Sequence, residues 1–591
     1  MVSTKTWYVF LVMSEALTNA EIAGRLKEIR TLMEFAGEPF FKFMAYERAA
    51  ETIENAAPLA DVLAGGRLQE LPGVGKTIAA RIAELCETGT CGFLEELRAR
   101  YPSTLLEVLA VGGVGMKTAQ QLFERLGVAS LDDLQLALDA GRLSELPRLG
   151  KKSIENIRRG VLAYQGRTKR TPLGIALPLA AEIIAYLAAS APVHDLTPAG
   201  SVRRQEPTVG DIDIVCTSDD PAAVIAAFTR WDRAEAVLAE GGTKGSIWLA
   251  GGLQIDLRVL PAHVYGNLLQ HFTGSREHNI QFRELAVRKN LRVSENGIVD
   301  LTDGRLIVCR TEAEVYATVG LMEIPPEMRL GVGEIEAARD GTLPHVVALA
   351  DLRGDFHMHS SWSDGADTLE TMVAAAAARG YEYHSISDHS IGRWRGLDPE
   401  KLRAQRARAH ALGERYNIRT LCSAEVDILA DGSLDYDDAL LAELDIVVAS
   451  VHAGHNQSRD EMTARLIRAC ENPYVSIIGH PTGRNVETPF AGYDFDYDAV
   501  FAAAARTGTA LEIDGQPSRL DLPSALARRA REFGVTFTCD SDAHSSAQLV
   551  QVEYAVGQAR RAWITAAEVL NARSLAGVLA FVGTKRSTVP I

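Results

Sequence analysis

The sequence lacks the features that mark several classes of protein. Its 591 residues include only 7 cysteines, none of them in a C-x-x-C pair, which argues against a disulfide scaffold and against a cysteine-bound zinc. No apolar run reaches the roughly 20 residues that cross a bilayer. The N-terminal stretch has no apolar core followed by a cleavage site, so it does not read as a signal peptide. We therefore expect a cytoplasmic protein with no membrane partner.

Positive charge is also scarce. The net charge is -16, whereas proteins that bind nucleic acids usually carry an excess of Lys and Arg. The most basic stretch, residues 142–170, contains nine basic and two acidic residues. This stretch is either a solvated helix face with a linker or a contact with a DNA backbone.

The chain is too long for one core, and its length predicts three to five compact units. Residues 20–165 favour short helices joined by glycine turns. Strand-like runs follow at 210–216 and 253–259, and residues 272–292 favour helix. A Pro- and Gly-containing segment then ends at Pro344 and is interpreted as a linker. After Leu352, short β-rich runs alternate with alanine-rich helices, a pattern typical of an α/β barrel or open sheet.

One short pattern occurs three times in the helical part. It reads apolar-x-Gly-apolar-Gly before a helix at 71–79 and 111–119, and it is degraded at 146–154, where Arg148 takes the first glycine position. Such turns expose backbone N–H groups at a helix N-terminus, which suits a DNA phosphate. A single copy is more often a plain connection, but the repetition resembles the helix-hairpin-helix motif. The expected DNA contacts are Gly73, Gly75, Gly113, Gly115 and Lys117.

Three carboxylates lie on two strand-like runs. Alternation places Asp211 and Asp213 on one face of the first run, with Ile212 and Ile214 on the other. The second run adds Asp256 between apolar residues that pack inward. An Asp-x-Asp pair alone is usually a solvated turn or strand end, but three carboxylates on adjacent strands suit two Mg²⁺ ions.

A second element stands just before the first pair of carboxylates. The segment Gly200-Ser201-Val202-Arg203-Arg204 offers a backbone turn, a hydroxyl and guanidinium groups, which together can hold a triphosphate. Its combination with the Gly-Asp-x-Asp run is specific. The two elements together indicate a triphosphate site beside a site for metal ions.

Residues 20–330 resemble a family X DNA polymerase, the group that includes polymerase beta, and His271-Phe272-Thr273-Gly274-Ser275 is similar to its thumb. The resemblance implies that Asp211 and Asp213 bridge two Mg²⁺ or Mn²⁺ ions and that Asp256 binds the ion that activates the primer 3'-hydroxyl. His271 and Phe272 would flank the sugar of the incoming nucleotide, Asn279 its base edge, and Arg283 the templating strand. The implied nucleotide-binding residues are Gly200, Ser201, Arg204, Gly210, Arg258, His271, Phe272, Gly274 and Asn279.

Two positions depart from that family. His271 stands where the family more often has tyrosine, which bears on sugar discrimination. Arg81 stands where members with deoxyribose-phosphate lyase activity have a Schiff-base lysine. A guanidinium stays protonated and forms no imine, so we expect weak or absent lyase activity.

Nine of the 14 histidines lie after Leu352, most of them directly after an apolar strand-like run. One histidine at a strand end is more often a hydrogen-bonded core residue. A series of them, with carboxylates, predicts ligands that converge at one end of a barrel. Imidazole mixed with carboxylate suits two or three Zn²⁺, Mn²⁺ or Fe²⁺ ions. The candidate ligands are His357, His359, Asp364, His389, Glu425, His452, His480, Asp542 and His544.

This set resembles the PHP (polymerase and histidinol phosphatase) domain over residues 350–575 and fills every ligand position of its pattern. Attached to a family X polymerase, such a domain implies a Mn²⁺-dependent 3'-5' exonuclease or related processing of 3' ends and abasic sites. We expect Asp388 to orient a ligand histidine and His384 to pack in the core, and His455 is undecided. Four arginines lie either near the substrate phosphate or on the surface: Arg393, Arg395, Arg484 and Arg519.

The expected fold is multi-domain, α+β and α/β, with a helical helix-hairpin-helix region, a nucleotidyltransferase palm and thumb, and a distorted (β/α)7 PHP barrel. We place an N-terminal helical domain like the 8 kDa domain of polymerase beta first. The expected boundaries are 1–95 for that domain, 96–168 for a fingers-like DNA-binding subdomain, 169–265 for the palm, 266–330 for the thumb, 331–349 for the linker and 350–591 for the PHP domain.

Three readings of function follow. The first is a template-directed polymerase that fills gaps during base excision repair or end joining, with a nuclease that trims 3' ends. The second is a template-independent nucleotidyltransferase joined to a phosphatase, and the third is a DNA-bridging scaffold with decayed sites. The helix-hairpin-helix repeats and the complete ligand sets favour the first. Its expected partners are gapped or nicked double-stranded DNA and dNTPs, and we expect a monomer.

Overall fold

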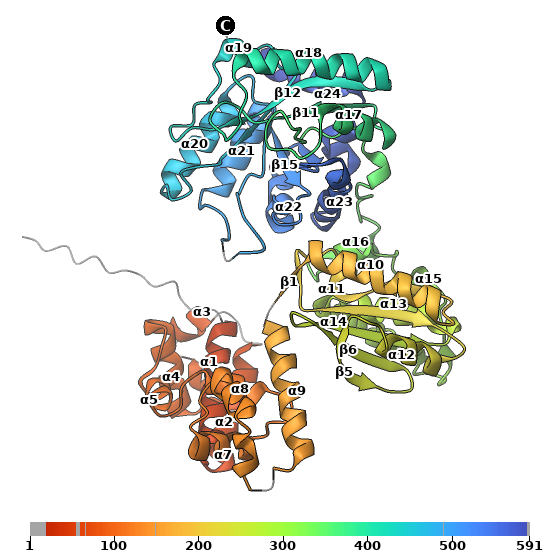
Figure 1. The fold of residues 1–591 in the computed structure, drawn as a ribbon. Coiled ribbons are helices and arrows are strands. Elements are labelled where there is room, and N and C mark those ends of the chain that lie inside the picture. The colour runs from red at the N-terminus through yellow and green to blue at the C-terminus, as the bar shows by residue number, and fades with distance from the viewer. Residues whose placement is uncertain are drawn as a thin grey trace, which may run out of the picture. The chain divides into compact units, whose positions relative to one another are not determined.

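A computed structural model describes residues 19–54, 59–64, 67–147, 149–168, 170–488 and 490–587, and Figure 1 shows its helices and strands. The chain forms two compact units, which divide between Thr168 and Lys169. The position of Arg148 in the third glycine repeat lies outside the described residues, as does Lys169 of the basic stretch.

The first unit is helical throughout its described residues, as the sequence predicts. One hydrophobic core gathers residues from Ile22 to Leu97, and a second gathers residues from Leu105 to Val161 together with Phe35. The elements are α1 (Asn19–Phe35), α2 (Phe40–Glu54), α3 (Leu59–Ala64), η1 (Leu68–Glu70), α4 (Lys76–Thr88), α5 (Gly92–Arg100), α6 (Leu105–Ala110), α7 (Met116–Leu126), α8 (Leu131–Asp139), η2 (Arg142–Glu145) and α9 (Lys151–Thr168).

The second unit begins with a palm region built on a five-stranded sheet of order β2-β4-β7-β6-β5. β4 and β7 are parallel neighbours, as expected for the carboxylate strands, and the other pairs are antiparallel. The sequence did not predict β5 and β6. The palm elements are β1 (Thr171–Pro172), α10 (Leu173–Ser190), β2 (Leu196–Pro198), α11 (Gly200–Arg203), β3 (Thr208–Val209), β4 (Asp211–Thr217), α12 (Pro221–Thr229), β5 (Ala234–Glu240), β6 (Lys244–Leu249) and β7 (Leu253–Leu260).

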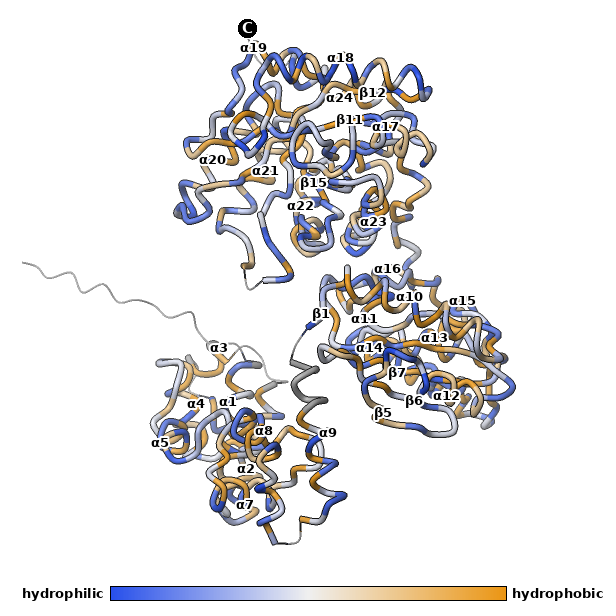
Figure 2. The backbone as a smooth tube through the Cα atoms, in the orientation of Figure 1, coloured by the Kyte–Doolittle hydropathy of each residue, from blue (hydrophilic) through white to orange (hydrophobic). Residues whose placement is uncertain are grey.

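Helix α10 is the one helix in the described part of the chain that is long and apolar enough, by length and composition alone, to cross a membrane. Figure 2 shows its hydrophobic residues. Ala176, Ala180, Ile183 and Leu187 recur every three or four positions and are fully buried in the palm core. α10 therefore has the pattern of a helix that packs one face onto a folded domain.

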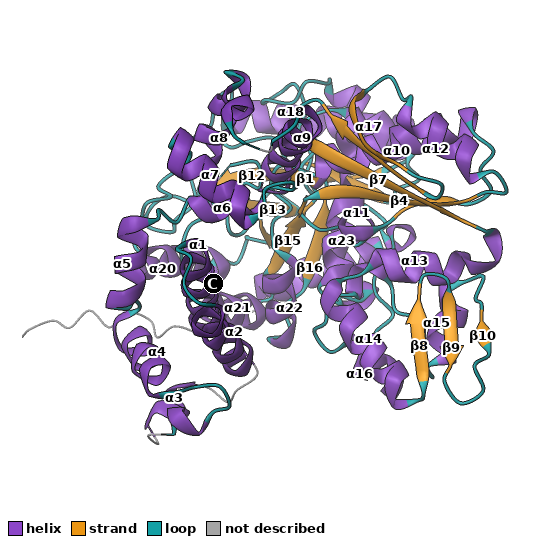
Figure 3. Ribbon diagram, turned by 90° about the horizontal axis from the view of Figure 1, so that it is seen from below, coloured by secondary structure: helices purple, strands orange, loops and turns teal. Residues whose placement is uncertain are grey.

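The thumb region combines helices with a small antiparallel sheet of order β10-β9-β8, visible as a separate sheet in Figure 3. The helix expected over residues 272–292 is interrupted near Gly274 and gives way to β8. The elements are η3 (Ala262–Val264), α13 (Tyr265–Thr273), α14 (Arg276–Arg288), β8 (Leu291–Ser294), β9 (Gly297–Asp300), β10 (Leu306–Ile307), α15 (Glu312–Thr318), η4 (Pro326–Met328) and α16 (Glu334–Asp340).

The segment 331–349, expected to be a linker, contains the helix α16. Its first residue, Glu334, is fully buried and contacts His278 Nδ1 at 2.8 Å, and Ile335 joins the thumb core. Val347 N–H donates a hydrogen bond to Ile564 O. Buried contacts therefore fix this segment to the thumb and to the C-terminal region.

The C-terminal region is an α/β fold with a curled parallel sheet of order β11-β12-β13-β14-β15-β16. Its strands are β11 (Tyr383–Ile386), β12 (Arg419–Asp427), β13 (Ile446–Ser450), β14 (Ile477–Ile478), β15 (Ala510–Asp514) and β16 (Phe537–Asp540). Its helices are η5 (Leu349–Asp351), α17 (Leu369–Ala378), α18 (Pro399–Tyr416), α19 (Asp438–Leu441), α20 (Arg459–Glu471), α21 (Tyr497–Thr507), α22 (Ser524–Glu532), η6 (Ser546–Gln551), α23 (Val552–Arg561), η7 (Ala566–Glu568), η8 (Leu570–Ala572) and α24 (Leu575–Ser587).

The extended segment 355–358 takes the seventh place in this fold. On one side Asp355 O and Met358 O accept hydrogen bonds from the backbone of Ser385 and Ser387, and on the other Met358 forms a parallel bridge with Ala543. The predicted fold class, including the distorted barrel, is confirmed.

Candidate functional site

The three predicted carboxylates of the palm lie together. In the parallel pair β4 and β7, Asp213 stands opposite Asp256, and Asp211 lies two positions before Asp213 on the same face. The residues between them are buried, as the alternation predicts. Burial and the charges of Asp211 and Asp256 raise the pKa of Asp213 to about 7. Three like charges in one place favour a cation between them.

Asp256 is held by its neighbours on the sheet. Its Oδ1 accepts hydrogen bonds from Ser246 Oγ at 2.5 Å and from Gln254 Nε2 at 2.9 Å. Lys244 Nζ lies 3.5 Å from Oδ2. These contacts fix the orientation of the carboxylate, which a metal site requires.

The predicted triphosphate turn forms the short helix α11 directly beside these carboxylates. A Cβ built on Gly200 would lie 2.2 Å from Asp213 Oδ2, so only glycine fits there. The side chain of Arg204 is half-buried and its Nη1 donates to Thr273 O at 2.5 Å. The structure thus brings the turn and the carboxylate cluster into contact.

The predicted sugar- and base-binding residues lie around the end of α13 and the start of α14. The guanidinium carbon of Arg258 lies 5.5 Å from the Phe272 ring centroid. Asn279 Nδ2 donates to His271 O at 2.8 Å, and Gly274 approaches Arg204 so closely that a Cβ would lie 2.9 Å from its Nη1. Arg283 is exposed on α14. The set thus adjoins the triphosphate turn at Gly274.

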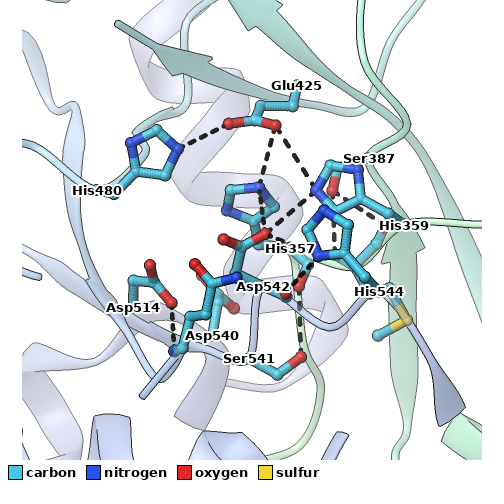
Figure 4. A network of polar contacts seen from close by, with 12 residues as sticks. His357, His359, Ser387, Glu425, His480, Asp514, Asp540, Ser541, Asp542 and His544 are labelled. Atoms are coloured by element: carbon cyan, nitrogen blue, oxygen red, sulfur yellow. Dashed lines mark hydrogen bonds and ion pairs between the residues drawn. The ribbon is translucent and has the colours of Figure 1, made fainter. Parts of the chain in front are cut away.

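In the C-terminal region all nine predicted ligands form one cluster with the buried Glu425 at its centre. The Glu425 carboxylate lies 2.8 Å from His389 Nδ1, 2.9 Å from His480 Nε2 and 3.1 Å from His452 Nε2. Figure 4 shows its further contacts, at 3.4 Å to His357 Nε2 and 3.6 Å to His359 Nε2. The remaining ligands, Asp364, Asp542 and His544, gather around His359.

Three groups within this cluster have the spacing of metal sites: His359, Asp364, His389 and His544; His357, His359 and Glu425; and His389, Glu425 and His452. Among the described residues, His359 Nδ1 and Nε2 and His357 Nε2 are buried and have no hydrogen-bond partner. Buried imidazole nitrogens without a partner are costly unless they bind a cation. The donor set therefore fits two or three divalent ions.

The charge states of the histidines also fit the binding of divalent ions. Burial lowers the pKa of His359 to about 4 and that of His480 to about 3, so both rings are neutral near pH 7. Burial also lowers the pKa of His389, but the charges of Glu425 and Asp364 outweigh burial and raise that pKa to about 10. A metal ion would displace that proton, since ligand imidazoles are neutral.

Several residues that support the cluster were not predicted. Glu512 Oε1 lies 2.6 Å from His357 Nδ1, and Asp427 Oδ1 lies 2.6 Å from His452 Nδ1. Such contacts orient a ligand ring. Glu512 sits with Asp514 in an acidic-x-acidic pattern on an apolar strand, the signal that identified the palm carboxylates, and it could have been found in the same way.

The expectation that Asp388 orients a ligand histidine is wrong. Its carboxylate accepts hydrogen bonds from Ser360 N–H, Ser360 Oγ, Ser363 Oγ and Gln405 Nε2. Asp388 therefore holds the loop that follows His359, rather than a ring. His384 is a core histidine as predicted: it is fully buried and contacts Thr420 Oγ1 at 3.0 Å.

His455 and the four arginines of the sequence analysis lie at different places relative to the ligand cluster. His455 stacks on Phe490 outside the cluster. Arg519 reaches the cluster, with Nε 3.8 Å from Asp542 Oδ2. Two others donate hydrogen bonds to backbone oxygens: Arg484 Nε to Arg519 O, and Arg395 Nη2 to Ser361 O. Arg393 Nε is buried and has no hydrogen-bond partner among the described residues.

The first two glycine repeats form the predicted tight turns. Gly73 and Gly113 have φ values of +78° and +93°, a region open to glycine, while Gly75 and Gly115 are the N-caps of α4 and α7. Lys117 lies in the first turn of α7. The N–H groups at the start of each helix are therefore oriented as an anion site requires.

Arg81 lies in a pocket of about 550 Å³ beside the first of these turns. Its guanidinium carbon is 3.5 Å from the Phe93 ring centroid and 5.4 Å from that of Tyr46. Lys42 and Lys76 line the same pocket. The Arg81 guanidinium therefore stacks against two aromatic rings inside this pocket.

Comparison with known proteins adds independent findings. The DNA polymerase beta thumb family matches residues 268–330, two helix-hairpin-helix families match 17–91 and 105–160, and the PHP domain family matches 355–484. The chain is 36% identical over 568 residues to the DNA polymerase/3'-5' exonuclease PolX of Bacillus subtilis (strain 168), covering 95% of this chain and 99% of that protein. A protein of Syntrophotalea carbinolica named "Probable phosphatase" is 30% identical over 240 residues, which are 39% of this chain and 95% of its own length.

Proposed function

Because this chain belongs to the bacterial family X DNA polymerases with a C-terminal PHP domain, and is a DNA-directed DNA polymerase with a metal-dependent 3'-5' exonuclease, we propose that it fills short gaps during DNA repair. The palm would insert the nucleotide and the PHP domain would trim or unblock the 3' end, including at abasic sites. The supporting observation is the pairing of Asp213 with Asp256 across parallel strands, next to the triphosphate turn. A higher kcat/KM for insertion on gapped than on open primer-template DNA tests the gap preference.

In the palm, Asp211, Asp213 and Asp256 would hold two Mg²⁺ or Mn²⁺ ions. Such ions lower the pKa of a primer hydroxyl and stabilise charge on the leaving pyrophosphate. The backbone at Gly200 and Gly210, with Ser201 and Arg204, would bind the triphosphate. His271 and Phe272 would flank the sugar, with Gly274 and Arg258 supporting them, Asn279 at the base edge, and Arg283 on the templating strand.

In the PHP domain the nine ligands would hold two or three ions, with Mn²⁺, Zn²⁺ and Fe²⁺ all compatible with mixed imidazole and carboxylate donors. These ions supply an activated water and offset charge at phosphorus. Glu512 and Asp427 would keep two of the ligand rings in place, and Arg519 beside Asp542 would contribute positive charge toward a substrate phosphate.

The helical unit would grip gapped or nicked double-stranded DNA through its two glycine turns, with Gly73, Gly75, Gly113, Gly115 and Lys117 at the backbone phosphates. This mode explains how an acidic chain binds DNA, since a few N–H groups at helix ends contribute where overall charge does not. We propose that the enzyme acts as a monomer in the cytoplasm.

The pKa of Asp213 gives the polymerase site a defined pH dependence. Without metal this carboxyl has a raised pKa of about 7, so it is mostly protonated at pH 6 and ionised at pH 8. Because a proton competes with the metal, we expect the Mg²⁺ concentration for half-maximal insertion to be about tenfold higher at pH 6 than at pH 8. Titrations of single-nucleotide insertion at the two pH values measure this, and an unchanged half-saturation contradicts it.

Because Arg81 stands where a lyase is expected to have its lysine, we expect the N-terminal pocket not to cleave DNA. Incubation with DNA that carries a 5'-deoxyribose phosphate, followed by borohydride, should trap no covalent adduct, because a protonated guanidinium forms no imine. The control is a lyase of known activity under the same conditions. A trapped adduct would contradict the prediction, and mapping would then be directed at Lys42 and Lys76 of the same pocket.

A further inference from the structure

Helix α23 of the PHP domain contacts the polymerase's triphosphate turn. Arg561, its last residue, donates from Nη1 to Arg204 O at 2.5 Å and from Nη2 to Glu206 Oε2 at 2.8 Å. One turn earlier, Gln558 Nε2 donates to Gln205 O at 2.8 Å, and Gly557 packs against the Gln205 side chain. Three consecutive residues of the palm are therefore held by one helix of another domain.

The contact is built rather than incidental. The side chain of Arg561 is 6% exposed, and its Nε also approaches Ser524 Oγ at 3.4 Å. Gln205 has φ of 55°, a left-handed conformation that a non-glycine residue keeps only when its surroundings hold it. A buried guanidinium that loses its partners destabilises the fold, so we expect Arg561 to keep its contacts with Arg204 O and Glu206.

Glu206 is the centre of this contact. Its Oε2 pairs with Arg561, and its Oε1 lies 3.6 Å from Arg204 Nη2. Arg204 is the arginine proposed to bind the triphosphate, and a carboxylate so close competes with phosphate for its charge. Arg561 offsets that competition, because it shares the negative charge of Glu206.

The same helix is part of the PHP core. Val552, Ala555, Val556 and Ala559 of α23 pack in one hydrophobic cluster with residues of β15 and β16, the strands that precede and support the second metal cluster. A change at Arg561 therefore reaches the polymerase turn from the domain that carries the other activity.

We propose that Arg561 is a positioning residue for nucleotide binding: the PHP domain neutralises Glu206 so that Arg204 is free to bind the triphosphate of the incoming nucleotide. The inference rests on the proposed role of Arg204. The affinity of the polymerase for dNTP then depends on the PHP domain. The domain acts through the charge of Arg561 and not only by supporting the fold.

A double-mutant cycle tests this. Arg561→Met leaves Glu206 paired with Arg204 alone, and we expect the KM for dNTP in single-nucleotide insertion to rise about fivefold or more, with kcat within about twofold. Glu206→Gln in the same chain removes the competing charge, and the double variant should return KM to within about twofold of wild type. A purely structural role for Arg561 predicts no such rescue.

Two further variants separate the possible failures. Arg528→Met, which removes a PHP–thumb hydrogen bond to Val332 O, should leave KM unchanged. Arg204→Met should raise KM; if it does not, the proposed function of that turn is wrong. If Arg204→Met raises KM but Arg561→Met does not, or if Glu206→Gln fails to rescue, the role of Arg561 is overturned while the proposed function stands.

Discussion

Asp256→Asn should reduce nucleotide insertion on gapped DNA by about 1,000-fold or more, because the site loses one of three carboxylates that hold the catalytic ions. Asparagine keeps the size of the side chain, so the hydrogen-bonding residues Ser246 and Gln254 remain in place. The 3'-5' exonuclease should stay within about twofold of wild type, since the two clusters share no residue. Quench-flow insertion kinetics and release of mononucleotides from a labelled primer measure the two activities.

The matched control is Asp219→Asn, an exposed aspartate of the same region that lies 3.1 Å from His194 Nε2. It should leave both activities unchanged. Substantial insertion by Asp256→Asn at saturating Mg²⁺ would show that this carboxylate does not hold a catalytic ion. Loss of both activities together would show that the two centres are not independent.

Glu425→Gln should impair the exonuclease and leave nucleotide insertion intact. Glu425 contacts five ligand histidines, and it is the carboxylate shared by two of the three metal groups. Removing its charge should lower exonuclease activity by about 1,000-fold or more and reduce the metal content of the purified protein. Insertion should stay within about twofold of wild type. Elemental analysis measures the metal independently of activity.

Glu443→Gln is the control for that variant, since Glu443 is a surface carboxylate paired with Arg403 and Arg406. It should change neither activity nor metal content. Retention of exonuclease activity by Glu425→Gln would place the hydrolytic centre elsewhere in the chain. Loss of activity with full metal content would mean that Glu425 acts on the substrate and not as a ligand.

The two metal clusters could be predicted because their signals are local. Asp211 and Asp213 share a strand face by simple alternation, and the histidines of the PHP domain follow apolar runs that become parallel strands. The carboxyl ends of parallel strands meet at one edge, so convergence could be inferred without coordinates. The first prediction used the period of a strand, and the second used the position of each ligand after an apolar run.

The parts that escaped prediction depend on contacts between segments far apart in the chain. β5 has partly exposed residues and no regular apolar alternation, so its pairing with β6 was not visible. Asp388 bonds the loop after His359 and not a ring, a distinction that only the folded loop reveals. The contact of Arg561 with Glu206 joins residues 355 positions apart. The helix α16 was hidden because prolines and glycines flank it.

The most direct test of the account is insertion of single dNTPs into DNA with a one-nucleotide gap, for each of the four templating bases, with Mg²⁺ and dNTP or with Mn²⁺ alone. We expect the complementary nucleotide to be inserted in each case, insertion to disappear in Asp256→Asn, and Mn²⁺-dependent digestion of the primer to disappear in Glu425→Gln. Addition that ignores the templating base would contradict the account, as would wild-type protein that neither extends nor digests the primer.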